Sequence, residues 1–513
     1  MRAALALLSG LLLALSFPKF GHAALAWVSL APLLVALTLA AHNGASRWHS
    51  FRLGYLTGLG YFCGTLYWLS QVMATYGDLP IVVAGLLAFG LAAWLSVFVG
   101  LFASLTGGAV RRYGVQGLWL APCFWVTTEW FRAWLGGNFP WVLLGSSQSS
   151  SLPVVQLASV TGVYGLSAMV VSVGVVIAIL TLSRNRAQRR TAAIAALGLA
   201  LIPVWGAWRM SKSGLLAQGV PMRVGLVQGN IPQKQKENPA FGAAILDRYI
   251  ALTREAIGAG SQLVLWPEAS TPFFFEIDAN QAEPIRRLAR ESQTPVLVGT
   301  DQYEAPSSSG PGKYFNGAVL VGQDGRNRDS YQKIHLVPFG EFVPFKRLLF
   351  FVKPLVENVA DFTHGSRPTV FDAEGTRFSV AICYEVIYSG LAREFVNNGA
   401  QLLTTITNDA WFGRSSAASQ HFEQAGIRAV EQGRYLVRSA NTGISGGFDP
   451  YGRVLARTEL FTTVATTVDV RLLSGRTVYN AIGDTIVYLA FAGTMAGVLL
   501  GRGRWTPPPV RRG

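Results

Sequence analysis

The chain has 513 residues, half of them hydrophobic and only 14% charged, whereas soluble proteins carry about 25% charged residues. This composition excludes a disordered chain, a collagen-like fibre and an ordinary soluble enzyme. Three cysteines exclude a disulfide scaffold, and the spacing of Cys63, Cys123 and Cys383 suggests no zinc site.

The net charge of +15 is distributed unevenly along the chain. Residues 211–480 are nearly balanced, with 27 Lys/Arg against 25 Asp/Glu, whereas the remainder holds 16 Lys/Arg and only Asp78, Glu129 and Asp484. A nucleic-acid-binding protein carries its excess charge on a folded polar surface. Here the excess lies between long apolar runs, which indicates a membrane protein and no nucleic-acid partner.

Eight apolar runs follow one another along the chain: residues 3–17, 23–39, 53–76, 79–105, 115–134, 163–182, 192–208 and 481–500. Most reach the ~20 residues that cross a ~30 Å hydrocarbon core. The first run is short and ends at Pro18, so a cleaved signal peptide is the alternative for it. No small-x-small cleavage site precedes the second run, which favours a retained span.

Basic residues accumulate in alternate connections between these runs. One side holds 13 arginines: Arg2, Arg47, Arg52, Arg111, Arg112, Arg184, Arg186, Arg189, Arg190, Arg502, Arg504, Arg511 and Arg512. The opposite side holds only Lys19, Arg132 and Arg209. The positive-inside rule then places both termini in the cytoplasm. We expect seven spans in residues 1–215, a periplasmic catalytic domain in 216–478, and an eighth span with a basic cytoplasmic tail in 479–513.

The segment between the seventh and eighth runs alternates predicted strands with amphipathic helices. Strands are expected at residues 224–227, 263–266, 296–300, 318–321, 378–382, 401–407, 435–439, 446–448 and 466–470. Helices are expected at residues 239–257, 283–291, 390–397 and 421–432. Helices that cover both faces of a sheet are typical of an α/β sandwich. The fold class predicted is therefore a multi-span α-helical membrane domain plus an extramembrane α/β domain.

Three local sequences place a reactive side chain beside a buried apolar stretch. The first is Leu-Val-Leu-Trp-Pro-Glu, which ends at Glu268. A carboxylate at the carboxyl end of a strand lies at the sheet edge where α/β proteins bind ligands. Partial burial is expected to raise the pKa of Glu268, which suits a general base. The alternative is a surface carboxylate in a turn.

The second sequence, YQKIHLVPFGE, places Lys333 among apolar and aromatic residues. A fixed ammonium there stabilises an oxyanion or a thiolate, and Glu341 is positioned to orient Lys333 or a substrate amine. The alternative for Lys333 is a lysine that extends its ammonium to water from an amphipathic edge.

The third sequence, Val-Ala-Ile-Cys-Tyr-Glu, holds the one cysteine of the extramembrane segment. Cys383 follows a strand and precedes an expected helix, so we predict an exposed sulfur with a lowered thiol pKa. The alternative is a buried small hydrophobe, which is the better interpretation of Cys63 and Cys123. Together Glu268, Lys333 and Cys383 supply a base, an oxyanion-stabilising cation and a nucleophile. The sequence offers no metal or cofactor motif beside them.

These motifs resemble the Glu–Lys–Cys triad of the nitrilase, or carbon–nitrogen hydrolase, superfamily. The chain is also similar to the membrane branch of this superfamily, the apolipoprotein N-acyltransferases. That similarity lies in the motif YxKxHLVPFGE, in the Trp-Phe pair at 411–412, and in the segments EWFR, NFPW and GVYGLS of the membrane part. The resemblance covers nearly the whole chain. It implies an α-β-β-α sandwich and a ping-pong acyltransferase that uses a cysteine thioester.

The resemblance also implies partners and roles. The donor would be a glycerophospholipid such as phosphatidylethanolamine, and the acceptor the α-amine of the S-diacylglyceryl-cysteine of an apolipoprotein. Catalysis would fall to Glu268, Lys333 and Cys383 without metal or cofactor, with support from Glu341, Tyr384 and Glu385. A monomer is expected. One departure is Glu237, which stands where the family usually has a tryptophan in a loop near the entrance.

Other residues have two interpretations. Glu129 lies within a span, which suggests function, but Arg132 on the same helical face suggests a paired charge. The aromatic residues Phe139, Trp141 and Trp411 are candidate lipid contacts.

Two other functions compete with the acyltransferase. One is a membrane-tethered amidase that uses water as acceptor, and the other is a non-enzymatic transporter or scaffold.

Overall fold

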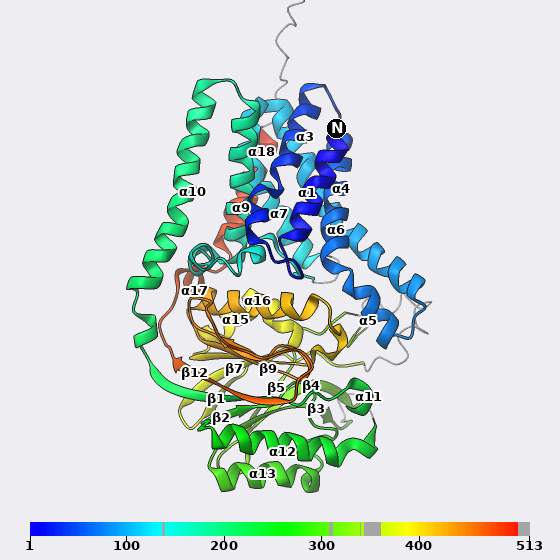
Figure 1. Ribbon diagram of the computed structural model, residues 1–513, viewed down its shortest axis with the longest axis vertical. Helices are drawn as coiled ribbons and strands as arrows, with labels where there is room; N and C mark the ends of the chain where they lie inside the picture. Colours follow the sequence, from blue (N-terminus) through cyan, green and yellow to red (C-terminus); the bar gives the residue numbers. More distant parts are fainter. Residues whose placement is uncertain (136–138, 237, 307–310, 339, 343–360, 501–513) are drawn as a thin grey trace, which may run out of the picture. The chain divides into compact units, whose positions relative to one another are not determined.

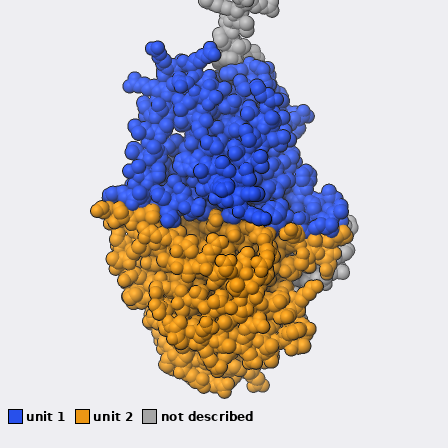
Figure 2. Space-filling model, viewed as in Figure 1, with its two compact units in different colours: residues 1–70, 81–209, 484–513 blue, residues 71–80, 210–483 orange. Residues whose placement is uncertain are grey.

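The computed structural model describes residues 1–135, 139–236, 238–306, 311–338, 340–342 and 361–500. The chain forms two compact units, coloured separately in Figure 2. The first comprises Met1–Ser70, Ile81–Arg209 and Asp484–Gly513, and the second comprises Gln71–Pro80 and Met210–Gly483. The short segment Gln71–Pro80 therefore belongs with the second unit although its flanks belong to the first.

The first unit is helical throughout its described part (Figure 1). Its helices are α1 (Arg2–Leu15), α2 (Ala23–Ser29), α3 (Ala31–His42), α4 (Arg47–Leu66), α5 (Trp68–Tyr76), α6 (Ile81–Tyr113), α7 (Ala121–Trp134), α8 (Leu152–Val155), α9 (Ala158–Leu182), α10 (Arg186–Lys212) and α18 (Thr485–Leu499), of which α5 and α10 extend into the second unit. Four stretches are long and apolar enough to cross a membrane, and α1 and α18 are shorter apolar helices. The protein is a multi-span membrane protein.

One helix boundary differs from the apolar runs in the sequence. The run at 23–39 divides at Leu30 into α2 and α3, because a proline occupies the first turn of α3.

Helix α10 has an exposed apolar face. Its residues Ile194, Leu197, Leu201 and Val204 are each more than half exposed. An exposed apolar helix face of this kind is expected where lipid replaces water as the solvent.

The second unit contains two six-stranded sheets. The first has the order β12-β1-β2-β3-β4-β5 and the second the order β11-β10-β9-β8-β7-β6. Their strands are β1 (Val220–Gln228), β2 (Leu263–Leu265), β3 (Val296–Glu304), β4 (Lys313–Val321), β5 (Asn327–Gln332), β6 (Val370–Ala373), β7 (Thr376–Ile382), β8 (Leu402–Thr407), β9 (Leu436–Ala440), β10 (Gly446–Phe448), β11 (Val454–Arg457) and β12 (Val464–Leu472). Strands β1, β2 and β3 run parallel, as do β7, β8 and β9.

Helices cover the outer face of each sheet, as Figure 1 shows. Helices α12 (Gly242–Gly258) and α13 (Ala279–Ser292) pack on the first sheet, and α15 (Ser389–Asn397) and α16 (Ala417–Gln432) on the second. The two sheets face each other, and the Ser439 hydroxyl of β9 donates to the carbonyls of Val227 and Leu265 in the other sheet. The predicted α-β-β-α sandwich is confirmed.

Candidate active site

Three strands end where the predicted catalytic residues begin. Glu268 follows β2, Lys333 follows β5 directly, and Cys383 follows β7 directly. Strand β5 is antiparallel to β4, which is antiparallel to β3, so β2, β3 and β5 end at the same edge of the first sheet. Carboxyl ends of strands are where α/β folds place their ligands.

The charged side chains of the first sheet form a buried cluster. The Lys333 ammonium lies 3.1 Å from Glu268 Oε1 and 2.9 Å from Glu341 Oε1. The Lys333 and Glu268 side chains are only 1% and 8% exposed. This burial excludes the alternative of a lysine that extends its ammonium to water. Burial lowers the pKa of Lys333, but the two neighbouring carboxylates outweigh this effect and hold the pKa well above its usual value.

The electrostatics of Glu268 correct the expectation of a raised pKa. Burial alone raises the pKa of Glu268, but the Lys333 charge and three hydrogen bonds outweigh it, and the net shift is downward. Those bonds come from Lys333 and the Asn316 amide at Oε1 and from the Asn408 backbone N–H at Oε2, 2.8 Å away. Glu268 is therefore an ionised carboxylate at neutral pH, which a general base must be.

Asn316 is a site residue that the sequence did not reveal. It lies in β4, and its amide nitrogen is 2.7 Å from Oε1 of both Glu268 and Glu341. The bridge fixes the distance between two carboxylates that would otherwise repel each other. A polar side chain flanked by buried residues in β4 is the signal that would have pointed to it.

Lys236 is a second residue that was not anticipated. From the short helix α11 (Gln233–Lys236), its ammonium donates to the backbone carbonyls of Glu268 and Ala269, at 3.2 and 2.9 Å. Ala269 has a φ of 46°, a conformation that costs a non-glycine residue energy. Lys236 thus stabilises the turn that carries Glu268. Its neighbour Glu237, the position of the expected tryptophan, lies outside the described residues.

Cys383 differs from prediction in two respects. It is only 8% exposed, and burial together with the Glu268 charge raises its thiol pKa far above the usual value, although Lys333 opposes this shift. Cys383 begins a short 3-10 turn, η6 (Cys383–Ile387), and the expected helix follows this turn as α15 (Ser389–Asn397). The prediction of an exposed thiol with a lowered pKa was wrong, because the negative cluster and the dry setting disfavour the thiolate.

Glu385 and Tyr384 lie within η6, next to Cys383. Glu385 Oε1 accepts from the Tyr331 hydroxyl at 2.8 Å and from the Ile334 and His335 amides at 2.6 and 3.0 Å, while Oε2 accepts from the Ile382 amide at 2.7 Å. Glu385 thereby joins the Lys333 segment to the Cys383 turn. Burial raises its pKa to about 7 despite these donors. The Tyr384 ring packs edge-on against Tyr388.

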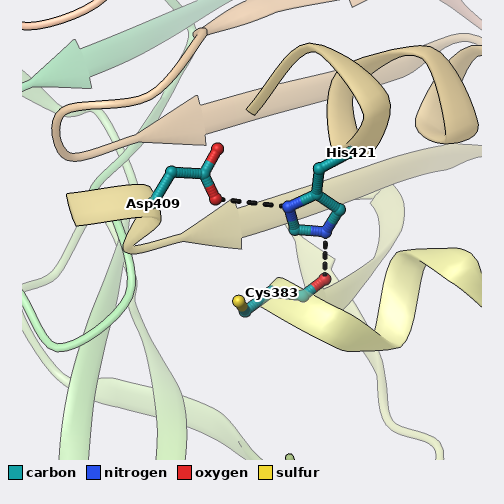
Figure 3. A group of neighbouring side chains, drawn as sticks. All are labelled: Cys383, Asp409 and His421. Carbon is teal, nitrogen blue, oxygen red and sulfur yellow. Dashed lines mark hydrogen bonds and ion pairs between the residues drawn. The ribbon is translucent and has the colours of Figure 1, made fainter. Parts of the chain in front are cut away.

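A third buried group lies next to the backbone of Cys383 (Figure 3). His421 of α16 is hydrogen-bonded through Nε2 to the Cys383 carbonyl at 3.0 Å, and its Nδ1 lies 3.2 Å from Asp409 Oδ1 and 3.0 Å from Arg438 Nη2. Donor atoms of Cys383, Asp409 and His421 lie within 4.8 Å of one another, as in a metal site. However, Arg438 binds Asp409 Oδ2 at 2.7 Å, and this cation opposes a second one there.

The candidate lipid contacts occupy different settings. Trp141 is 1% exposed and its ring lies 5.5 Å from that of Trp68, so it belongs to the interior of the helical unit. Phe139 stacks on Trp141 and is partly exposed. Trp411 is 37% exposed and packs against Tyr76, whose hydroxyl donates to the Ala410 carbonyl at 2.7 Å. The contacts of these three residues with lipid stay a prediction.

Glu129 and Arg132 hold a loop of the helical unit. Their closest charged atoms are 3.9 Å apart and both side chains are 3% exposed. Glu129 accepts from the Leu144 amide at 2.7 Å, and Arg132 donates to the Trp141 and Val142 carbonyls at 3.0 and 3.3 Å. The buried pair therefore satisfies backbone groups that have no regular partner, which agrees with the paired-charge interpretation.

Comparison with known proteins covers both parts of the chain. Residues 9–176 match the family described as apolipoprotein N-acyltransferase N-terminal domain, and residues 223–477 match the carbon-nitrogen hydrolase family. The apolipoprotein N-acyltransferase of Geobacter metallireducens is 39% identical over 95% of this chain and 93% of its own length. That of Methylococcus capsulatus is 36% identical over 94% and 92%.

Among solved structures, the chain is similar to an amidase of the nitrilase superfamily from Nesterenkonia. The identity is 21% and the TM-score 0.40, over 54% of this chain and 99% of the amidase.

Proposed function

Since this chain belongs to the apolipoprotein N-acyltransferase family, we propose that it moves an acyl chain from phosphatidylethanolamine to the α-amine of a diacylglyceryl-cysteine. The acyl chain is carried as a thioester on Cys383. The observation that supports this assignment is the buried Glu268–Lys333 pair, whose two charges both act on the Cys383 thiol.

In the first step, the Cys383 sulfur attacks the ester carbonyl of the phospholipid. Since the thiol pKa is raised and Glu268 is ionised, the proton passes to Glu268 as the sulfur–carbon bond forms, without a standing thiolate. Lys333 and the Tyr384 backbone N–H stabilise the oxyanion. When the intermediate collapses, the carbon–oxygen bond breaks, the proton of Glu268 goes to the leaving oxygen, and the lysophospholipid departs.

In the second step, the neutral α-amine of the lipoprotein attacks the thioester carbonyl. Glu268 takes a proton from the attacking nitrogen, the carbon–sulfur bond breaks, and that proton returns to the Cys383 sulfur. The product is an amide, and the free thiol is regenerated. Amines react readily with thioesters, so the site serves transfer as long as it excludes water.

The remaining roles follow from the contacts. Glu341 and Asn316 hold Lys333 and Glu268 in register, and Glu385 fixes the Cys383 turn to the Lys333 segment. The arginine distribution supports a topology with both termini in the cytoplasm and the α/β unit in the periplasm. Phe139 and Trp411 remain candidate contacts of the acyl chains, whereas Trp141 would require a rearrangement to meet one.

The test uses the purified full-length protein in detergent or vesicles. It is given phosphatidylethanolamine with a labelled acyl chain and a synthetic peptide that begins with S-diacylglyceryl-cysteine. We expect the label in an amide at the peptide N-terminus, and none in a matched peptide whose α-amine is acetylated. Release of labelled fatty acid alone would contradict the proposal and favour an amidase-like hydrolase.

A further inference from the structure

The peptide that joins Cys383 to Tyr384 has a strained backbone. Cys383 has a φ of 52°, in the left-handed region that residues other than glycine rarely occupy. Such conformations persist where the surrounding contacts hold them in place. One contact of this peptide comes from outside its own turn, from the His421 side chain on α16.

The hydrogen bond between His421 and the Cys383 carbonyl can run in only one direction, with His421 as the donor. The Cys383 carbonyl can accept but not donate, so Nε2 carries the hydrogen at 3.0 Å. Figure 3 shows the carbonyl oxygen of Cys383 facing the imidazole while the sulfur points away from it. His421 is therefore placed to act on the backbone of the nucleophile rather than to remove the proton of its thiol.

Arg438 and Asp409 set the state of the imidazole. Burial and the Arg438 charge lower the pKa of His421, which makes the ring neutral at neutral pH. Nδ1 contacts both Arg438 Nη2 at 3.0 Å and Asp409 Oδ1 at 3.2 Å, so these two residues fix the ring while Nε2 keeps its hydrogen toward the Cys383 carbonyl. Asp409 neutralises Arg438 at 2.7 Å and is itself held by the Thr407 hydroxyl at 2.8 Å. His421, Asp409 and Arg438 are at most 1% exposed, so water does not compete for these contacts.

We infer that His421 is a positioning residue for the oxyanion site, which it orients and polarises through the Cys383 carbonyl. The carbonyl of Cys383 and the N–H of Tyr384 belong to one planar peptide unit. A hydrogen bond accepted by its oxygen strengthens the N–H as a donor, because linked hydrogen bonds polarise one another. The inference rests on the proposed function, in which this N–H stabilises the oxyanion of both steps.

Two reactions of the same sulfur separate this role from a structural one. Acylation by a phospholipid passes through a tetrahedral oxyanion, whereas alkylation by iodoacetamide is a displacement at a saturated carbon and needs no oxyanion donor. A residue that only keeps the domain folded or the sulfur in place affects both reactions. A residue that acts on the oxyanion peptide affects acylation alone.

The experiment compares three full-length variants in a Cys63→Ala, Cys123→Ala background, which leaves Cys383 as the single thiol. His421→Gln keeps an amide donor at the reach of Nε2, His421→Asn has the same amide one carbon shorter, and His421→Leu has no donor. Single-turnover acylation by phosphatidylethanolamine and alkylation by iodoacetamide are measured by intact-protein mass spectrometry.

We expect the leucine and asparagine variants to acylate about 10²-fold more slowly, near the lower limit for loss of one oxyanion donor. The phospholipid KM should not change, and alkylation should stay within about twofold, since neither depends on the oxyanion peptide. The glutamine variant should acylate within about fivefold of the parent, because it restores the donor. If the leucine variant does not fold, the glutamine–asparagine pair decides.

The inference is overturned if the asparagine variant acylates like the parent, if acylation and alkylation fall together, or if glutamine fails to restore acylation in a folded protein. A parent protein that forms no acyl adduct while iodoacetamide still alkylates it would instead contradict the proposed function.

Discussion

The two sheets of the sandwich contribute to the site in different ways. The first sheet supplies charged side chains: Lys333 pairs with Glu268 and Glu341, and the Asn316 amide bridges these two carboxyl groups. The second supplies the thiol of Cys383, whose pKa is raised and whose backbone carbonyl accepts from His421. In the mechanism that we propose, nucleophilicity therefore does not require a preformed thiolate. A base and a cation on one sheet act on a thiol that the other sheet holds in place.

The largest loss of acyl transfer is expected for a substitution at Cys383, the site residue of the second sheet. Cys383→Ser is nearly isosteric, and we expect it to preserve the fold while acyl transfer falls by about 10⁶-fold, the usual cost of removing a nucleophile. The transfer assay with labelled phospholipid measures this, and thermal unfolding serves as the control. Transfer that continues at a tenth of the parent rate would exclude Cys383 as the nucleophile.

The next effect tests the first sheet. Lys333→Met removes a cation that two buried carboxylates share, so acylation should fall about 10²–10³-fold. The free energy of unfolding should drop by about 3–5 kcal/mol, because the two carboxylates lose the positive charge that they share. Single-turnover acylation and denaturant unfolding measure the two quantities.

A double variant separates catalysis from stability in this cluster. Lys333→Met with Glu341→Gln leaves one carboxylate instead of two, so much of the lost stability should return while acylation stays low. A double variant no more stable than Lys333→Met would contradict the electrostatic account of the cluster.

Asn316→Leu should have a smaller effect that shows the coupling within the first sheet. It removes the hydrogen bonds to Glu268 and Glu341, and a hydrogen bond to a charged group is worth about 1.5–3 kcal/mol, so acylation should slow by about tenfold or more. Since the Asn316 bond lowers the pKa of Glu268, the acid limb of the acylation rate should move to higher pH. Gln302→Leu removes a comparable bond, to Glu276, and should leave that limb in place. Equal shifts in both variants would contradict the assignment.

The smallest effect concerns stability against pH. Burial, and to a lesser extent His364, lower the pKa of His335 to about 4, while its ring stacks 4.1 Å from that of Tyr388. The unfolded chain therefore binds this proton more readily, and stability is lost as pH falls from about 6.5 to 4. His335→Gln should flatten this part of the unfolding curve, measured as melting temperature between pH 4 and 7. An unchanged slope would assign the acid sensitivity to another group.

Much of the fold followed from sequence because its signals are local. Buried strands such as β2 and β8 are continuous apolar or β-branched runs, and the helices on the sheets are amphipathic. Three strands were not anticipated. Strand β5 has the sequence Asn-Arg-Asp-Ser-Tyr-Gln, and β6 and β11 are short. All three lie at sheet edges, where a strand pairs with only one neighbouring strand. A strand in this position does not need a continuous apolar sequence.

The sequence pointed to three residues of the candidate site but not to their electrostatics. A reactive side chain beside an apolar stretch is visible in a sequence, and this pattern pointed to Glu268, Lys333 and Cys383. The pKa of each depends on the others and on donors from distant segments, such as Asn316 and the Asn408 N–H. For this reason the directions expected for Glu268 and Cys383 were both wrong. Asp409, His421 and Arg438 were missed because they act on a backbone carbonyl.

The most direct test of the central claim is intact-protein mass spectrometry of the full-length protein after incubation with phosphatidylethanolamine and no acceptor. We predict a mass increase of one acyl chain, located at Cys383 by peptide mapping and lost when the acceptor peptide is added. Absence of an adduct, or an adduct at any other residue, would contradict the claim that this thiol carries the acyl chain between the two substrates.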